Sequence, residues 1–293
     1  MAKSSFADPY SERLHTARDL WRRFRRRHSA VIGLALLLLL FAASIFAPVF
    51  MPHDPEKLKL SQALIAPGAQ FLLGTDHLGR DMLTRLLYGA RLSLTIGFLA
   101  VAFGLAVGLP LGAISGYYGK WVDLVIQRFA DILLAFPSFL LALSLVAMLG
   151  VGLQNIIISV GISAVPSFIR LVRGSVLTIR EQTYVESARS VGVRDGRIIW
   201  LHVLPNAMAP VIVQATLNLG SAILIAAGLG LLGLGVQPPT PACGSMLGEG
   251  RNYIFSHPYM ATFPGLAIFI AVLGFNLLGD GLRDALDPRL RHV

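Results

Sequence analysis

The chain has 293 residues, of which 55% are hydrophobic and 14% are charged, and its mean hydropathy is +0.67. Soluble domains carry about 25% charged residues, so this composition indicates an integral membrane protein. The net charge of +9 comes from residues spread over segments between apolar runs, which favours contacts with lipid headgroups over nucleic acid. One cysteine, Cys243, excludes an internal disulfide, and the seven histidines form no Cys/His metal-binding pattern.

The first 51 residues divide into a basic segment and an apolar run. Residues 1–29 are polar, and five arginines lie between positions 22 and 27. Because arginines gather on the cytoplasmic side of a membrane, we expect a cytoplasmic amphipathic segment here. Residues 30–51 carry no charge and are long enough to cross the hydrocarbon core, which predicts the first transmembrane helix. A cleaved signal peptide is the alternative, although the run is long for one and no small-residue cleavage site follows it.

Residues 52–91 form a polar segment that the orientation of the first helix places outside the cytoplasm. Two acids, Asp76 and Asp81, alternate here with Arg80 and Arg85. We expect the acids to cap a helix or to pair with the arginines. A catalytic pair of carboxylates is the alternative, and it is disfavoured because alternating acids and arginines neutralise one another.

Residues 92–283 are predicted to form a transmembrane core, whose five spans are 92–116, 122–149, 155–171, 207–234 and 263–278. With the first helix, they make an all-α integral membrane protein of six transmembrane helices. The third span is expected to bend at Pro137 and to hold Arg128 and Asp131 as an ion pair near its cytoplasmic end. A second extracytoplasmic segment covers 236–262, and 284–293 form a cytoplasmic tail.

Small residues and amides indicate where these helices contact one another. Glycines recur at every fourth position of the second span, which places them on one face and lets another helix approach closely: Gly104, Gly108, Gly112 and Gly116. Pro110 would loosen this helix. The last two spans contain three amides: Gln214, Asn218 and Asn276. Amides within a span either tie helices together or line a polar pathway, and the sequence leaves both open.

A polar loop, residues 180–206, connects the fourth and fifth spans, and its arginines predict a cytoplasmic location. Thr183 and Glu186 have the spacing of a capping box, which predicts a short helix. Gly192 would end this helix. Its apolar face would consist of Val185, Ala188 and Val191.

A second short helix is expected over 194–203, with Pro205 stopping it. The two helices would form a helix-turn-helix across the membrane surface, which we call the knuckle (residues 183–206). An amphipathic connector that rests on lipid headgroups is the alternative.

The knuckle resembles the EAA loop of permease subunits in ABC importers. Five positions match that loop: Glu186, Ala188, Gly192, Leu204 and Pro205. Ser187 and His202 depart from it, where the family has a second alanine and an isoleucine. The resemblance implies a coupling helix that docks on a separate ATP-hydrolysing subunit. The residues implied in this contact are Tyr184, Val185, Glu186, Ser187, Ala188, Arg189, Gly192, Leu204 and Pro205.

Three further segments are similar to peptide-type ABC permeases. One runs from Gly74 to Leu94, one is the Pro-Pro-Thr-Pro run that begins at Pro238, and one is the ending from Asn276 to Pro288. The family usually has a tryptophan where this chain has Cys243, at a place expected to face the entrance of the pathway. That departure weakens any inference about the transported solute.

The resemblance implies a type I ABC importer permease fold and a specific set of partners. These are a second permease (a different chain), one or two ATPase subunits, an extracytoplasmic solute-binding protein and membrane lipids. Gly119-Lys120 is followed by Trp121, so the sequence has no phosphate-binding loop. ATP and magnesium are therefore expected on the partner subunits, with no cofactor, metal or catalytic residue in this chain.

The implied location is the bacterial inner membrane, with both termini in the cytoplasm. The implied solutes are dipeptides, oligopeptides or peptide-like molecules such as glutathione. Nickel or another small solute is an alternative within the same family. An ion-coupled secondary transporter is a further alternative, which would be expected to show an ionisable site at mid-membrane and inverted repeats.

Overall fold

The computed structural model describes residues 22, 24–25, 27–50 and 54–286, so most of the predicted segment 1–29 and positions 287–293 of the predicted tail lie outside the described residues. Within this part the fold is helical, apart from an isolated bridge between Thr75 and Asp81. Five helices are long and apolar enough to cross a membrane, and a bent pair of helices makes a sixth candidate span. The prediction of an all-α membrane protein is therefore confirmed, with five candidate spans, or six when the bent pair is counted as one.

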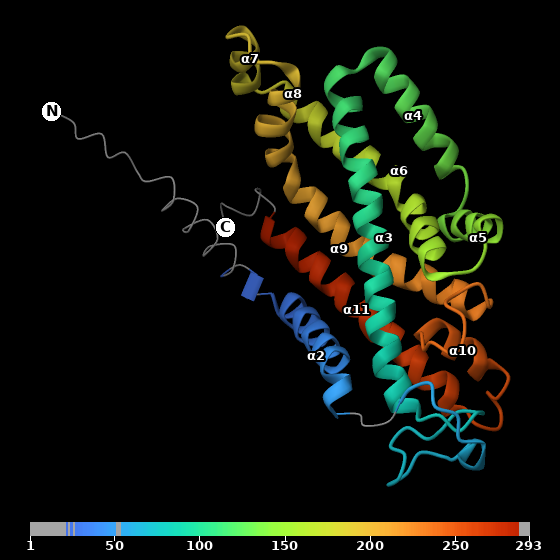
Figure 1. The fold of residues 1–293 in the computed structure, drawn as a ribbon. Helices are drawn as coiled ribbons and strands as arrows, with labels where there is room; N and C mark the ends of the chain where they lie inside the picture. Colours follow the sequence, from blue (N-terminus) through green and yellow to red (C-terminus); the bar gives the residue numbers. More distant parts are fainter. Residues whose placement is uncertain (1–21, 23, 26, 51–53, 287–293) are drawn as a thin grey trace.

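The elements run along the chain as a set of long helices joined by short ones (Figure 1). In order they are α2 (His28–Phe50), a 3₁₀ turn (Leu60–Gln62), α3 (Met82–Tyr118), α4 (Lys120–Leu134), α5 (Ser138–Leu149), α6 (Leu153–Arg180), α7 (Thr183–Ser190), α8 (Asp195–Ile198), a π-helical turn (Ile199–Val203), α9 (Leu204–Leu231), α10 (Cys243–Arg251) and α11 (Tyr259–Leu286). We call the two ends of the bundle the α7 end and the α10 end. Residues 54–81 cover the α10 end.

Helix α3 begins earlier than predicted, at Met82 rather than at residue 92. The Asp81 side chain caps it by accepting a hydrogen bond from the Thr84 backbone N–H at 2.9 Å. Arg85 lies in the first turn and is paired with acids, so its charge does not oppose helix formation there. The hydropathy of the sequence could not reveal this early start of α3. Charged residues such as Arg85 are typical of a polar loop, and only the fold shows that acidic partners neutralise them.

The predicted glycine seam lies where α3 packs closely on α6. Gly104, Gly108, Gly112 and Gly116 are all buried and face α6. A Cβ atom added at Gly112 would lie 2.7 Å from the Ile169 carbonyl oxygen, and one at Gly116 would lie 2.9 Å from that of Arg173. Real Cβ atoms do not approach so closely, so the backbones of α3 and α6 are in direct contact along this face. Pro110 lies within α3, which continues through it.

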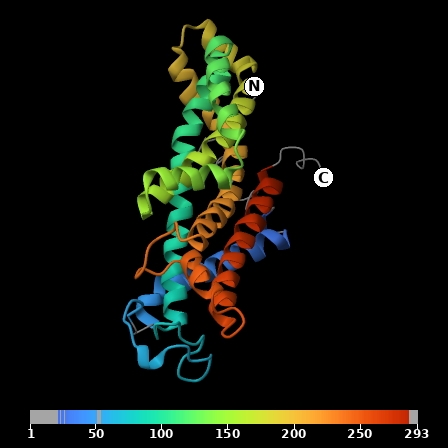
Figure 2. The same ribbon diagram turned by 90° about the vertical axis from the view of Figure 1, so that its right-hand side faces the viewer.

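The third predicted span is broken rather than bent. Helices α4 and α5 meet at 87°, with the break at residues 135–137, and Figure 2 shows α5 lying across the long axis of the bundle. Pro137 causes the break because a proline removes a backbone N–H and excludes helical geometry from the residue before it. Arg128 lies 4.0 Å from Asp131, but the closer partner of Asp131 is Arg170 on α6, at 2.7 Å.

The main core lies where α3, α6, α9 and α11 meet. Its buried side chains include Leu94, Phe168, Ile223 and Phe275, one from each helix. Helix α2 packs on α11 at the side of this core, where a Cβ at Gly33 would lie 2.8 Å from the Leu278 backbone nitrogen. The four central helices therefore hold the two ends of the bundle in a fixed relation.

Candidate functional site

Helix α7 forms the tip of the knuckle at the α7 end (Figure 1). Val185 is fully buried, whereas Glu186 and Ser187 are exposed on the side away from the bundle, and Arg189, one turn after Val185, is exposed beside the buried face. The predicted capping box is absent: Gln182 occupies the N-cap position without a side-chain cap, and Thr183 is already helical. The helix still forms because its apolar side is buried against the bundle, which stabilises a short helix more than a cap does.

Gly192 reverses the chain after α7. Its φ of +78° lies in the left-handed region, which glycine adopts without strain, and its N–H donates to the Arg189 carbonyl at 2.9 Å. The helix has ended by Ser190, so Val191 does not continue the face of Val185 as predicted and is 79% exposed.

The second arm of the knuckle runs directly into α9, so the prediction that Pro205 stops it is wrong. Asp195–Leu231 form one continuous helical stretch, with a π-helical turn at Ile199–Val203 just before the proline. A wider turn can accommodate the missing N–H and the bulk of a proline ring. The buried side chains of this arm are Ile198, Ile199, Val203 and Leu204, which pack against α3 and α6.

The exposed tyrosine of α7 links the two arms of the knuckle. The Asn206 side-chain amide donates to the Tyr184 hydroxyl at 3.1 Å and to the His202 carbonyl at 2.7 Å. The arms are thus joined by polar contacts on the outer side and by apolar contacts on the inner side. The knuckle is one packed unit rather than two independent helices.

A polar contact that the sequence analysis did not identify joins the knuckle to the end of α3. The Tyr117 hydroxyl donates to Asp195 Oδ1 at 2.7 Å and accepts from Arg189 Nε at 3.2 Å. The Arg189 guanidinium also lies 4.9 Å from the centre of the Tyr117 ring. Arg180 Nη1 donates to the Gly116 carbonyl at 2.9 Å. No sequence spacing links residues so far apart along the chain.

A second polar anchor lies beside it, between α4 and α6. The Asp123 carboxylate accepts two hydrogen bonds from Arg173, both at 2.6 Å, and a third from Ser115 at 2.6 Å. A bidentate pair of this kind fixes both position and orientation. The start of α4 is therefore held to the same two helices, α3 and α6, that carry the glycine seam.

Two of the three predicted pathway amides lie together and one lies apart. Gln214 Nε2 donates to Asn218 Oδ1 at 3.1 Å, and Asn218 Nδ2 donates to Ser167 Oγ on α6 at 3.3 Å. These two amides tie α9 to α6. Asn276 is exposed on α11, and its side chain has no hydrogen bond within residues 54–286.

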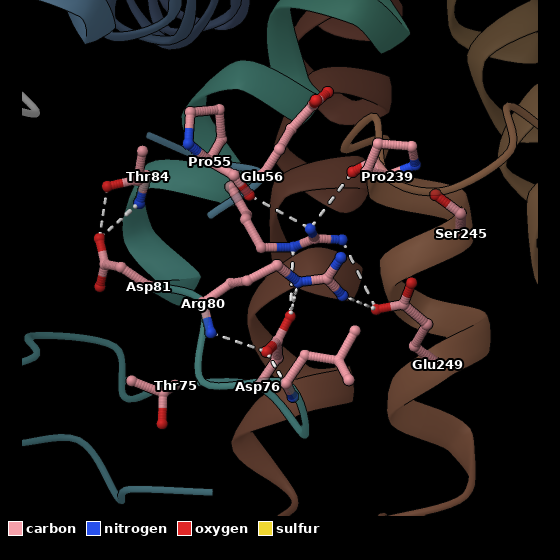
Figure 3. A network of polar contacts seen from close by, with 12 residues as sticks. Pro55, Glu56, Thr75, Asp76, Arg80, Asp81, Thr84, Pro239, Ser245 and Glu249 are labelled. Atoms are coloured by element: carbon pink, nitrogen blue, oxygen red, sulfur yellow. Dashed lines mark hydrogen bonds and ion pairs between the residues drawn. The ribbon is translucent and has the colours of Figure 1, made fainter. Parts of the chain in front are cut away.

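The α10 end contains a buried group of four charges, shown in Figure 3. Arg80 Nε pairs with Asp76 Oδ2 at 2.5 Å, and Arg80 Nη2 pairs with Glu249 Oε2 at 3.2 Å. Arg85 lies 3.5 Å from the same Asp76 oxygen and 3.6 Å from the same Glu249 oxygen. The side chains of Asp76, Arg80 and Arg85 are each 1% exposed. The two acids and two arginines cancel in charge, which allows them to be buried together.

This charge group joins three separate segments. Asp76 and Arg80 belong to residues 54–81, Arg85 to α3, and Glu249 to α10. Asp76, His77 and Glu249 also bring potential metal-ligand atoms within 4.8 Å of one another. Both carboxylates are already neutralised by arginines, so the donor set fits an ion-pair network rather than a cation site.

A hollow of about 600 Å³ lies beside this charge group, between the end of α9 and α10. Residues 230–238 form one wall, and the other wall is on α10 and includes Ser245, Glu249 and Arg251. Neither Glu249 nor Arg251 was predicted from the sequence to be a site residue. The hollow is large enough for a small organic molecule.

Cys243 was expected from the sequence to face the entrance of the pathway, but the structure buries it. It is 2% exposed at the start of α10, among Ala90, Ala227 and Ile268. Its backbone N–H donates to Ser93 Oγ on α3 at 3.4 Å. Burial away from water raises the pKa of the thiol to about 11. This position therefore packs α10 against α3.

The site thus consists of a helical bundle with a packed knuckle at one end and a hollow beside a buried charge group at the other. The family of inner membrane components of binding-protein-dependent transport systems matches residues 108–292. The N-terminal transmembrane domain of oligopeptide transport permease C matches residues 16–67. The chain belongs to this family of transport permeases, and its resemblance to ABC importer permeases is confirmed.

The chain is similar over nearly its whole length to curated proteins. It is 48% identical to the dipeptide transport system permease protein DppC of Alkalihalophilus pseudofirmus, over 97% of this chain and 94% of the relative. It is 46% identical to the glutathione transport system permease protein GsiD of Pectobacterium atrosepticum, over 94% and 91%. It is 47% identical to GsiD of Escherichia coli, over 93% and 90%.

The fold is similar to that of solved structures of the MetNI methionine ABC transporter in inward-facing conformations. One has a TM-score of 0.57 at 22% identity and covers 70% of this chain and 98% of the other. A second crystal form gives 0.55 at 23% identity with the same coverage. The type I importer fold is thereby confirmed.

Proposed function

We propose that this chain is a permease subunit of an ATP-driven importer for short peptides or peptide-like solutes. It would form the translocation pathway with a second permease and would be driven by separate ATPase subunits that carry the ATP and magnesium. A solute-binding protein would deliver the cargo. The observation that carries the proposal is the knuckle, whose exposed outer face is rigidly joined to the bundle.

The knuckle has the properties required of a coupling element. Glu186 and Ser187 on its outer face are free to contact another protein, while Val185 and Arg189 fix its inner face to α3 and α6, Arg189 through its hydrogen bond to Tyr117. A force applied to α7 is then transmitted to the long helices instead of deforming the loop. An amphipathic connector resting on headgroups would not need this polar anchoring.

The solute class is inferred from the relatives, whose names refer to dipeptides and glutathione. Both are small molecules with peptide bonds and charged ends. The proposed location is the bacterial inner membrane, with the α7 end and both termini in the cytoplasm. The N-terminus of α2 and the C-terminus of α11 lie at a common end, where Arg27 pairs with Asp284 at 3.3 Å. Basic residues around the knuckle support the same orientation.

The test is ATP hydrolysis by the reconstituted complex of permeases, ATPases and solute-binding protein. Glu186→Lys should abolish stimulation of ATP hydrolysis by the loaded binding protein, because it reverses a charge on the docking face. Gly192→Pro should do the same by removing the turn, since proline cannot adopt a φ of +78°. Both variants should still be found in the membrane.

The matched control is Ser190→Ala, which alters an exposed side chain at the end of α7 that bonds only to the Glu186 carbonyl of its own helix. It should leave stimulation unchanged. Normal stimulation in both test variants would contradict the proposal. Peptide uptake by this chain alone in proteoliposomes, driven by an ion gradient, would instead support a secondary transporter.

A further inference from the structure

The hollow at the α10 end presents two charged side chains from one short helix. Glu249 and Arg251 both line it, and the opposite wall includes Gly233 and Gly235, which carry no side chains. A Cβ at Gly233 would meet no atom within 4 Å, so the chain there borders open space. The volume of about 600 Å³ lies within the range of about 300 to 1,000 Å³ typical of small-molecule sites. It exceeds what a single ion needs.

Glu249 has one oxygen engaged and one available. Oε2 accepts from Arg80 at 3.2 Å and lies 3.6 Å from Arg85, whereas Oε1 has no hydrogen-bond partner within the described residues. In Figure 3 the second oxygen of Glu249 points away from Arg80. The side chain is 20% exposed, unlike the three fully buried members of the charge group. Glu249 therefore offers a fixed acceptor to the hollow.

Arg251 is the complementary group. Its side chain is exposed and has no ion pair or hydrogen bond within residues 54–286. The charge group next to it is neutral, since its two acids and two arginines cancel, so Arg251 supplies the uncompensated charge of the hollow. An anionic group of a ligand would be attracted to Arg251, and a planar carboxylate matches the fork of a guanidinium.

We propose that this hollow is a binding site for a zwitterionic short peptide, with the terminal carboxylate on Arg251 and the terminal ammonium on Glu249 Oε1. Recognition of the two ends leaves the side chains of the peptide free, which suits a permease that accepts more than one sequence. Because Glu249 is already neutralised, its contact orients the ammonium, and Arg251 provides most of the attraction. The inference rests on the proposed function and specifies where its solute binds.

The first experiment pairs a substitution with a change in the solute. Arg251→Gln and wild-type complexes, each with the binding protein and ATPases, are assayed in proteoliposomes for uptake of Ala-Ala and of Ala-Ala amide. Arg251→Gln should lower kcat/KM roughly tenfold for the free dipeptide and less than twofold for the amide, because the amide lacks the carboxylate. The binding protein is the same in both complexes, so its own preference between the two solutes cancels when the variant is compared with the wild type.

Arg251→Lys should recover part of the loss, since it keeps the charge but not the fork. Lys57→Gln removes an exposed charge that does not line this hollow, and it should not discriminate between the two solutes. Equal loss for both solutes in Arg251→Gln would overturn the inference, because a purely structural role of Arg251 would affect both alike.

The second experiment needs no substitution of the charge group. A dipeptide carrying a diazirine is photolysed with the wild-type complex in nanodiscs without the binding protein. Adducts should fall within residues 230–238 and 245–252 and be reduced by excess Ala-Ala, and adducts confined to other segments would overturn the inference. If the wild-type complex imports peptides while both experiments fail, only the site is wrong. If it imports no peptide, the proposed function fails.

Discussion

Tyr117 and Asp195 are joined by a 2.7 Å hydrogen bond that ties the last turn of α3 to the first turn of α8. The same hydroxyl accepts from Arg189 on α7, so a single phenol holds both arms of the knuckle. This contact connects the element proposed to receive force with the longest helix of the bundle.

Removing that hydroxyl should weaken coupling more than folding. Tyr117→Phe leaves the ring in place but deprives Asp195 and Arg189 of their shared partner, which we expect to destabilise the α7 end by about 1–2 kcal/mol. Stimulated ATP hydrolysis per solute imported should rise as coupling is lost. Tyr118→Phe is the control, because Tyr118 is half exposed and has no side-chain hydrogen bond within the described residues. Identical behaviour of the two variants would show that the hydroxyl contact is unimportant.

A glycine-to-alanine substitution should have opposite effects within the glycine seam and outside it. Gly112→Ala should lower thermal stability, by about 1–3 kcal/mol, because the new methyl group would lie 2.8 Å from Val172 Cβ. Gly174→Ala places a methyl where no atom lies within 4 Å, and it should be neutral or raise stability by up to about 1 kcal/mol. Melting temperatures of the purified variants in detergent distinguish the two. Similar melting temperatures would mean that the helices separate more readily than the packing indicates.

The buried charge group should be sensitive to the loss of any member. Asp76→Asn would leave Arg80 and Arg85 sharing one acid, and breaking a buried ion pair destabilises proteins by about 3–5 kcal/mol. Asp54→Asn is the control, because Asp54 is exposed and bonds only to a local backbone N–H. Limited proteolysis of residues 54–81 would report the effect. Protection equal to that of the wild type would contradict the assigned role.

Cys243 should react slowly with maleimide, and its labelling rate should keep rising to a higher pH than the rate of an exposed thiol. The pKa of the Cys243 thiol is raised to about 11 by burial, so the reactive thiolate is scarce at pH 8 and increases roughly tenfold per pH unit up to about pH 10. Maleimide labelling of the native protein should follow this slope and become fast in denaturant. An exposed thiol introduced as Ser256→Cys in a Cys243→Ala background should label quickly and level off near pH 9. A plateau at that pH for Cys243 itself would show an accessible thiol.

Periodic features were predictable from the sequence, whereas contacts between distant residues were not. Gly104 to Gly116 recur every fourth residue, and a helix converts that period into one face, so the seam could be found without coordinates. Val185 was likewise assigned to a buried face. Glu249 could not be paired with Arg80, because the two are separated by many residues and nothing in their local sequence records the pairing.

Local rules failed where packing or a wider turn overrode them. Thr183 has the right spacing for a capping box, yet burial of Val185 stabilises α7 without a cap. Pro205 is an ordinary helix terminator, yet the π-helical turn before it lets α9 continue. The start of α3 was missed because Arg85 resembles a loop residue until its acidic partners are known.

Helix α3 has 37 residues and, at 1.5 Å per residue, is about 55 Å long, nearly twice the thickness of the hydrocarbon layer. The Tyr117 contact lies at one extremity and the Arg85 contacts at the other, so the helix is long enough to place both outside the hydrocarbon layer that its apolar part crosses. Because the seam glycines let α6 pack directly on the backbone of α3, we expect the two helices to move together. A tilt imposed on one side of the membrane would thus displace groups on the opposite side, without a diffusing signal.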